Sequence, residues 1–184
     1  TFSSRILGFV RDMVLARLFG ATPAADAFFV AYRVPNLLRE LFAEGSMSAA
    51  FIPVFTEYHT LKAKRDAWEL ASATFTTLLT IVTAVTLVGI LAAPGIVWLL
   101  APGFRESVDK LALTTLLTQL MFPYLIFISL AALAMGILNS LRDFAAPAFS
   151  PVFFNIFTIA CMLFLSPWLS EPILAVAIGI VVGG

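Results

Sequence analysis

Long uncharged and mostly apolar runs dominate the last two-thirds of the chain. Three of them, residues 70–104, 111–141 and 144–170, each exceed the roughly 18–20 apolar residues that an α-helix needs to cross a bilayer. A fourth run begins at Ile173 and continues to the last residue. These runs are long and uniformly apolar, without strict polar–apolar alternation, so they predict membrane-spanning helices and not the strands of a transmembrane barrel.

The first 51 residues are also apolar, but charged side chains interrupt them. Gly20 and Pro23 divide this part into two helical segments, and Pro35 predicts a kink in the second. A charge at the centre of a bilayer costs roughly 2.5–3.5 kcal/mol on insertion scales, so these side chains should line a protein interior or a watery cavity. The charged positions are Arg5, Arg11, Asp12, Arg17, Asp26, Arg33, Arg39, Glu40 and Glu44.

The pattern predicts an all-α polytopic membrane protein with about six transmembrane helices. The expected helices cover about residues 2–19, 25–51, 72–100, 109–140, 146–167 and 172–184. The last is too short to span a bilayer, so we expect the chain to be a fragment of a longer protein.

Local features refine this picture. We expect a charged loop over 57–69 with His59 in solvent, and bends at Pro123 and Pro147. Gln119 is a candidate for a hydrogen bond between helices. The threonines of 70–104 can bond back to their own helix and do not indicate a pore.

Composition supports the membrane assignment. Hydrophobic residues make up 61% of the chain and charged residues 12%, against about 25% charged in an average soluble domain, and the mean hydropathy is +1.01. The net charge is zero, so we expect no nucleic-acid partner. No metal-ligand spacing, nucleotide-binding loop or nucleophile–base set is present, so we expect neither a cofactor nor catalysis.

The distribution of basic residues predicts the orientation. Four basic residues lie in the loops of one side and two in those of the other. The positive-inside rule then places the amino terminus in the cytoplasm. The inner residues are Lys62, Lys64, Arg65 and Arg142, and the outer ones Arg105 and Lys110.

Helical spacing sorts the charges onto faces. Arg5 and Asp12 are seven residues apart and share a face, and Asp26, Arg33 and Glu40 repeat the same spacing. Arg17 points elsewhere, so either the first helix breaks near Gly8 or Arg17 snorkels to the outer interface.

Two interpretations of these charges remain open. Arginine holds phosphate oxygens bidentately, so several arginines around one cavity would suit a pyrophosphate cargo. Alternatively, Arg5 pairs with Asp12, and Arg33 with Asp26 or Glu40, and the pairs only hold the helices together. Arg11 and Arg39 have no acid on their own face and are the better candidates for cargo contact.

Several motifs together resemble the amino-terminal signature of the MurJ/MviN family, the lipid II flippases of peptidoglycan synthesis in the multidrug/oligosaccharidyl-lipid/polysaccharide exporter superfamily. The resemblance covers essentially the whole chain. The motifs are Ser4-Arg5-Ile6-Leu7-Gly8-Phe9-Val10-Arg11-Asp12, Ala16-Arg17-Leu18-Phe19-Gly20-Ala21, Asp26-Ala27-Phe28-Phe29-Val30-Ala31, Pro35-Asn36-Leu37-Leu38-Arg39, Phe42-Ala43-Glu44-Gly45 and Pro147-Ala148-Phe149-Ser150-Pro151.

The resemblance implies the first lobe of a 14-helix, two-lobe alternating-access transporter in the bacterial inner membrane. Its cargo would be lipid II, an undecaprenyl-pyrophosphate-linked disaccharide-peptide, and its partners membrane lipids and a carboxy-terminal lobe. The resemblance assigns substrate binding to Arg5, Arg11 and Arg39, and salt-bridge or gating roles to Asp12 and Asp26. Arg17, Arg33 and Glu44 complete the candidate gating residues.

Three hypotheses follow. The first is a lipid II flippase, driven by the membrane potential or an ion gradient because no nucleotide site is visible. The second is another exporter of the superfamily, for drugs or a polysaccharide lipid. The third is a non-transporting scaffold that recruits cell-wall enzymes, in which the arginines are only structural.

Overall fold

The computed structural model describes residues 2–42 and 50–184, and all regular structure in these ranges is helical. Two 3₁₀ turns, η2 (Pro102–Phe104) and η3 (Ser166–Trp168), lie in the connections. The α-helices are α1 (Phe2–Phe19), α2 (Pro23–Arg39), α3 (Ile52–Leu61), α4 (Lys64–Leu100), α5 (Val108–Met121), α6 (Tyr124–Ser140), α7 (Ala145–Leu165) and α8 (Leu174–Gly183).

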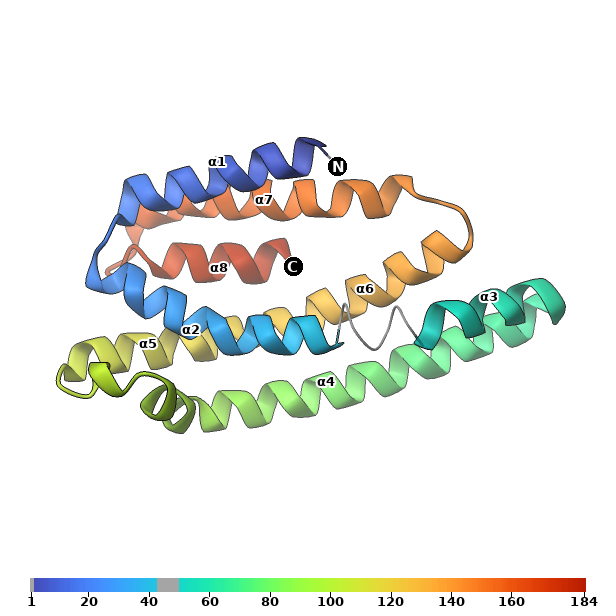
Figure 1. Cartoon of the computed structure of the whole chain (residues 1–184), viewed down its shortest axis with the longest axis horizontal. Helices are drawn as coiled ribbons and strands as arrows, with labels where there is room; N and C mark the ends of the chain where they lie inside the picture. The colour runs from blue at the N-terminus through green and yellow to red at the C-terminus, as the bar shows by residue number, and fades with distance from the viewer. Residues whose placement is uncertain (1, 43–49) are drawn as a thin grey trace.

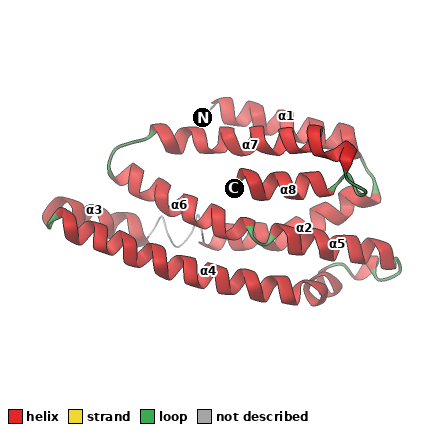
Figure 2. Ribbon diagram, turned by 180° about the vertical axis from the view of Figure 1, so that it is seen from behind, coloured by secondary structure: helices red, strands yellow, loops and turns green. Residues whose placement is uncertain are grey.

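The helices pack lengthwise in layers (Figure 1). α1 lies along α7, and α7 lies along α8. In Figure 1, α8 is seen between the pair of α1 and α7 and the layer that contains α2, α5 and α6. α4 forms the opposite edge against α5 and α6, and the short α3 folds back onto the start of α4 (Figure 2). The first helix is therefore held mainly by the seventh, and α8 packs on α7, α5 and α6.

Two apolar clusters hold these layers together. One surrounds α8, where Phe28 of α2, Met121 and Tyr124 pack with Met162 and Val176. Small residues such as Ala27, Ala31 and Ala177 are fully or almost fully buried there, which lets the helix backbones approach closely, as in membrane helix pairs generally. The second cluster joins α3, α4 and α6.

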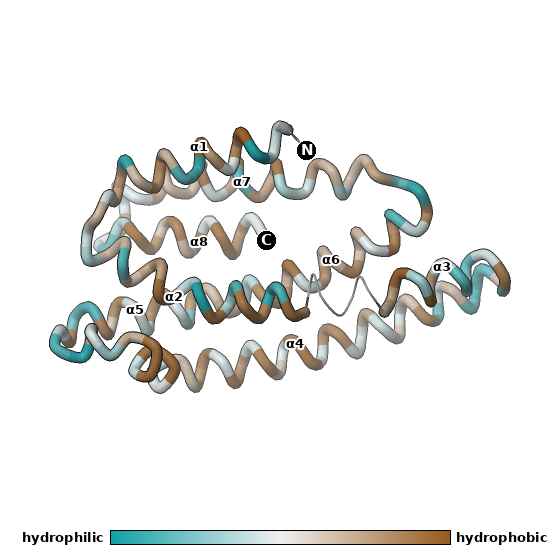
Figure 3. Tube along the Cα trace, in the orientation of Figure 1, coloured by the Kyte–Doolittle hydropathy of each residue, from teal (hydrophilic) through white to brown (hydrophobic). Residues whose placement is uncertain are grey.

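Three helical segments are long and apolar enough to cross a membrane by length and composition: 64–100, 108–140 and 145–168. Figure 3 shows the apolar residues along them, with hydrophilic residues gathered mainly in the connections and along α1 and α2. The all-α, multi-pass membrane prediction is confirmed. The connections after α1, α4 and α7 lie at one end of the molecule, and those after α3 and α6 at the other (Figure 1), as the predicted alternation of sides requires.

Several predicted boundaries were wrong. The region 57–69 is not a loop: α3 occupies most of its first half and α4 begins at Lys64, because Phe55 buries its ring against Ala67 and Ala71. His59 lies in α3, not in a loop, and its half-buried ring stacks on Phe55.

The expected second helix, 25–51, is regular α-helix only over Pro23–Arg39, with wider π-helical turns at 40–42 and 50–51. α1 runs unbroken through Gly8, so the alternative of a break there was wrong. The expected helix 109–140 divides into α5 and α6 at Pro123, where a bend was predicted. α2 continues through Pro35.

The predicted hydrogen bond from Gln119 is present and has a specific role. Its Nε2 donates to the carbonyl oxygen of Ile90 at 3.1 Å. Pro94 carries no N–H and cannot donate to this carbonyl four residues earlier, so α5 supplies the donor that α4 lacks. The hydroxyls of Thr74, Thr76 and Thr80 bond back to their own helix, as predicted.

Candidate functional site

The centre of the candidate site is an ion pair on α1. Arg11 lies near the middle of this helix, and its Nε and Nη2 both donate to Oδ1 of Asp12, at 3.0 and 2.8 Å. The interpretation that Asp12 pairs with Arg5 was therefore wrong, because the neighbouring arginine takes the carboxylate. A guanidinium has five N–H donors. With two directed at Asp12, three remain for a ligand.

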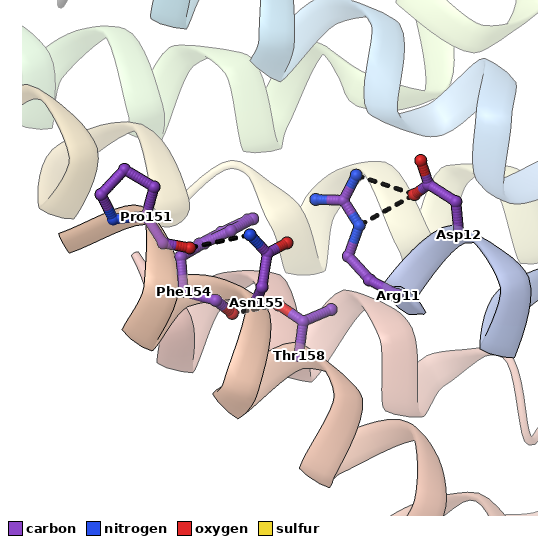
Figure 4. Close-up of polar contacts among 6 residues, drawn as sticks. All are labelled: Arg11, Asp12, Pro151, Phe154, Asn155 and Thr158. Carbon is purple, nitrogen blue, oxygen red and sulfur yellow. Dashed lines mark hydrogen bonds and ion pairs between the residues drawn. The ribbon is translucent and has the colours of Figure 1, made fainter. Parts of the chain in front are cut away.

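The guanidinium faces α7 (Figure 4). Its Cζ lies 6.0 Å from the ring centroid of Phe154, and Asn155 and Thr158 lie on the same side of α7. The Nδ2 of Asn155 donates to the carbonyl of Pro151 at 2.8 Å, while its buried Oδ1 accepts no hydrogen bond from the described part of the chain.

A pocket of about 110 Å³ opens beside this pair. Its walls come from four helices, although the sequence pointed only to the first two. Arg11 and Asp12 supply its charges and the remaining walls are mainly apolar or aromatic. The other lining residues are Leu15 of α1, Phe28, Phe29 and Tyr32 of α2, Phe154 and Thr158 of α7, and Val176 and Ile180 of α8.

Arg39 approaches the same region from the end of α2. Its Nε donates to Oδ1 of Asn36 at 3.1 Å, and its Nη2 lies 3.9 Å from Glu40. Arg11 and Arg39 both lie within electrostatic range of Tyr32 and Tyr124, whose hydroxyls are close enough to interact. Both predicted cargo arginines therefore lie near the Tyr32–Tyr124 pair, but only Arg11 lines the pocket.

Asp26 has a partner that the sequence did not indicate. Its Oδ2 accepts a hydrogen bond from Nζ of Lys110 at 3.0 Å, which ties the first turn of α2 to the first turn of α5. Lys110 also lies 4.0 Å from the ring centroid of Phe104 and is only 20% exposed. Pairing of Asp26 with Arg33 was therefore wrong.

The remaining candidate arginines lie apart from this pocket. Arg5, Arg17 and Arg33 are exposed and make no ion pair with any residue of 2–42 or 50–184. Arg17 stands in the last turn of α1, where a snorkelling side chain would reach the interface. Glu44 lies outside the described residues.

Sequence reasoning missed the uncharged half of the site. Tyr32, Phe154 and Thr158 lie on helical faces that periodicity alone cannot align, since α7 is more than a hundred residues away from α1. Lys110 carried a usable signal, because it is the last charged residue before the long apolar run 111–141.

These features define a class. A bundle of long apolar helices with an Arg–Asp ion pair beside a pocket is typical of a multi-pass membrane protein with a charged site among its helices. Comparison with known proteins identifies the family: residues 15–184 match the family described as lipid II flippase MurJ, and the chain belongs to it.

Individual relatives agree. The chain is 45% identical over 194 residues to a probable lipid II flippase MurJ of Vibrio cholerae and 40% identical over 184 residues to a lipid II flippase MurJ of Burkholderia cenocepacia, in both cases over 100% of this chain. A solved structure of lipid II flippase MurJ in an inward closed conformation superposes with a TM-score of 0.76 at 30% identity, covering all of this chain and 39% of that one. The chain spans about a third (36%) of the length of these two curated relatives.

Proposed function

We propose that the full-length protein containing this chain is a flippase, not an enzyme, that moves lipid II from the inner to the outer leaflet of the bacterial cytoplasmic membrane for peptidoglycan synthesis. The relatives named as lipid II flippases support this proposal. In it, the chain forms the amino-terminal lobe, and a carboxy-terminal lobe completes the cavity.

The observation that carries the proposal is that Arg11 lines the pocket with its charge paired and part of its guanidinium free to bind a ligand. Its charge is compensated by Asp12 on its own helix, and its side chain is about one-third exposed beside the pocket. The three donors that Asp12 leaves are suited to the oxygens of a pyrophosphate, since charge-assisted contacts to phosphate are strong and directional. Arg39 would supply a second positive charge.

The remaining assignments belong to the same proposal. The amino terminus lies in the cytoplasm, with Lys62, Lys64 and Arg65 on the inner side. The membrane potential or an ion gradient drives the cycle, since one charge crossing the full field gains about 2.3 kcal/mol per 100 mV. Arg5 joins the cargo site, and Arg17, Arg33, Asp26 and Glu44 act in gating.

The test compares variants of the full-length protein in cells depleted of their own flippase, with matched expression. Lipid II in each leaflet is measured for Arg11→Ala, Arg11→Lys and Arg39→Ala. The control is Arg65→Ala, because Arg65 is an exposed arginine of α4 whose partner is Glu69, one turn away and also exposed. Hydrogen bonds to charged groups contribute about 1.5–3 kcal/mol, so losing one should slow export about ten-fold or more.

We expect lipid II to stay in the inner leaflet with Arg11→Ala and Arg39→Ala, to be exported at an intermediate rate with Arg11→Lys, and to be exported normally with Arg65→Ala. Normal export by well-folded Arg11→Ala and Arg39→Ala proteins would contradict the proposal. It would favour an exporter of another cargo or a non-transporting scaffold.

A further inference from the structure

A second hollow lies on a different flank of the lobe, between α2 and α4. It has a volume of about 330 Å³, and every residue that lines it is apolar. Val34 and Leu38 form one wall, Val88 and Ala92 the other, and the ring of Phe122 closes its floor. We call this hollow the α2–α4 groove.

The groove exists because α4 packs mainly on α5 and α6 and only sparsely on α2. Its floor is rigid. Phe122 is 1% exposed, and its ring sits so closely on Gly89 that a β-carbon at that position would overlap it. The α4 side of the hollow is therefore fixed by packing, because Gly89 cannot move closer to the buried ring of Phe122.

The position of the groove decides what can fill it. Asp26, Arg33 and Glu40 lie on one face of α2, and that face must meet protein or water. At about 100° per residue, Val34 and Leu38 lie about 100° and 140° around the helix from Arg33. The groove therefore lies on a flank turned away from the charged face.

The α4 side of the groove is an exposed apolar surface. This part of α4 lies in a segment long and apolar enough to span the membrane. Val88, at the rim, is 64% exposed, and Leu91, just outside the groove, is 82% exposed. The lining offers no hydrogen-bond partner for water, a sugar or a phosphate, so such an occupant would leave its polar groups unpaired.

We propose that the α2–α4 groove binds one acyl chain of a bilayer phospholipid as a long-lived lipid. The groove is separate from the Arg11 pocket, and the two share no lining residue. The proposed occupant is a lipid of the surrounding membrane, and the polyprenyl tail of a cargo is the alternative that the labelling test separates from it. This inference does not depend on the proposed transport function.

The test uses the full-length protein in phospholipid nanodiscs that contain phosphatidylglycerol with a diazirine on its acyl chain. After illumination, the labelled residues are mapped by mass spectrometry. We expect Val34, Leu38 and Ala92, which face the groove, to carry at least three-fold more label than Leu91, which faces bulk lipid.

Variants separate a specific site from general lipid contact. Val88→Trp should cover the groove and lower labelling of Val34 and Leu38 at least three-fold, whereas Leu91→Trp, outside the groove, should leave it unchanged. Ala92→Phe should fill the groove from within and lower labelling in the same way, so it replaces Val88→Trp in the test if that variant fails to fold.

Three results would overturn the proposal. They are equal labelling of Leu91 and the groove residues, groove labelling unchanged in the folded Trp or Phe variant, and preferential labelling of the groove by a diazirine-bearing polyprenyl phosphate in a parallel sample.

Discussion

The hydrogen bond from Gln119 to the Ile90 carbonyl offers a sharp test of how this lobe holds together. Replacing Gln119 by Leu keeps the side chain close to its original size and apolar enough for the helix interior. It also removes the donor that compensates for Pro94, so the carbonyl loses both its helical and its interhelical partner.

The expected cost follows from the type of bond. A typical intramolecular hydrogen bond contributes about 0.5–1.5 kcal/mol net, and those between membrane helices average about 0.6 kcal/mol with a maximum near 1.7. Because the Ile90 carbonyl has no α-helical donor to fall back on, we place Gln119→Leu in the upper half of this range, at about 1 kcal/mol.

A double-mutant cycle with Pro94→Ala isolates the contribution of the Gln119–Ile90 hydrogen bond to stability. An alanine at position 94 restores an N–H four residues after Ile90, so Gln119→Leu should cost almost nothing in the Pro94→Ala background. The assay is the free energy of unfolding of the full-length protein in mixed micelles, measured for the parent, both single variants and the double variant. If Gln119→Leu has the same cost in both backgrounds, Gln119 does not act by compensating for Pro94.

Two further predictions use matched variants and the same unfolding assay. Gly179→Ala would bring a β-carbon to 3.0 Å from the Cα of Thr158 and the Cβ of Cys161, so α7 and α8 must separate. A β-carbon at Gly95 would meet no atom of another helix within 4 Å. Both variants gain the same helix propensity, so Gly179→Ala should be less stable than Gly95→Ala by about 1–3 kcal/mol, and equal stability would contradict this packing. Lys110→Met and Asp26→Asn should show a coupling energy of up to about 1 kcal/mol, because Asp26 is well exposed and its ion pair is screened; additive effects would show that the pair contributes nothing.

The sequence predicted those parts of the fold that depend on hydrophobic runs. The three uncharged runs became the three longest apolar helical segments, because a run of that length has no other low-energy structure in a membrane. Gln119 was predicted for a similar reason: a polar amide within such a run needs a partner on a neighbouring helix.

The charged loop over 57–69 failed as a prediction because tertiary packing overrode local polarity. Phe51 and Phe55 have apolar partners on α4 and α6, so the segment forms a helix that buries them despite Glu57, Lys62 and Lys64 nearby. Nothing within the segment itself reveals those partners.

The pairing of charges failed for a geometric reason. Helical spacing identifies which residues share a face, but it does not show which other helix lies opposite. Asp26 forms an ion pair with Lys110, which is 84 residues away, and Asp12 forms one with Arg11, its immediate neighbour. The expected partners seven residues away were about 10 Å distant along the helix axis, beyond the reach of a direct ion pair for most side-chain conformations.

The two ion pairs differ in a way that bears on transport. The Arg11–Asp12 pair lies within α1, so it persists however α1 moves relative to the other helices. The Asp26–Lys110 pair joins α2 to α5 and holds only while those two helices keep their present contact. Within the proposed function, α1 can carry a compensated arginine through a conformational change without exposing a bare charge to lipid, because its counter-ion travels with it. The three donors that Asp12 leaves on Arg11 then stay available to an anionic cargo throughout the movement.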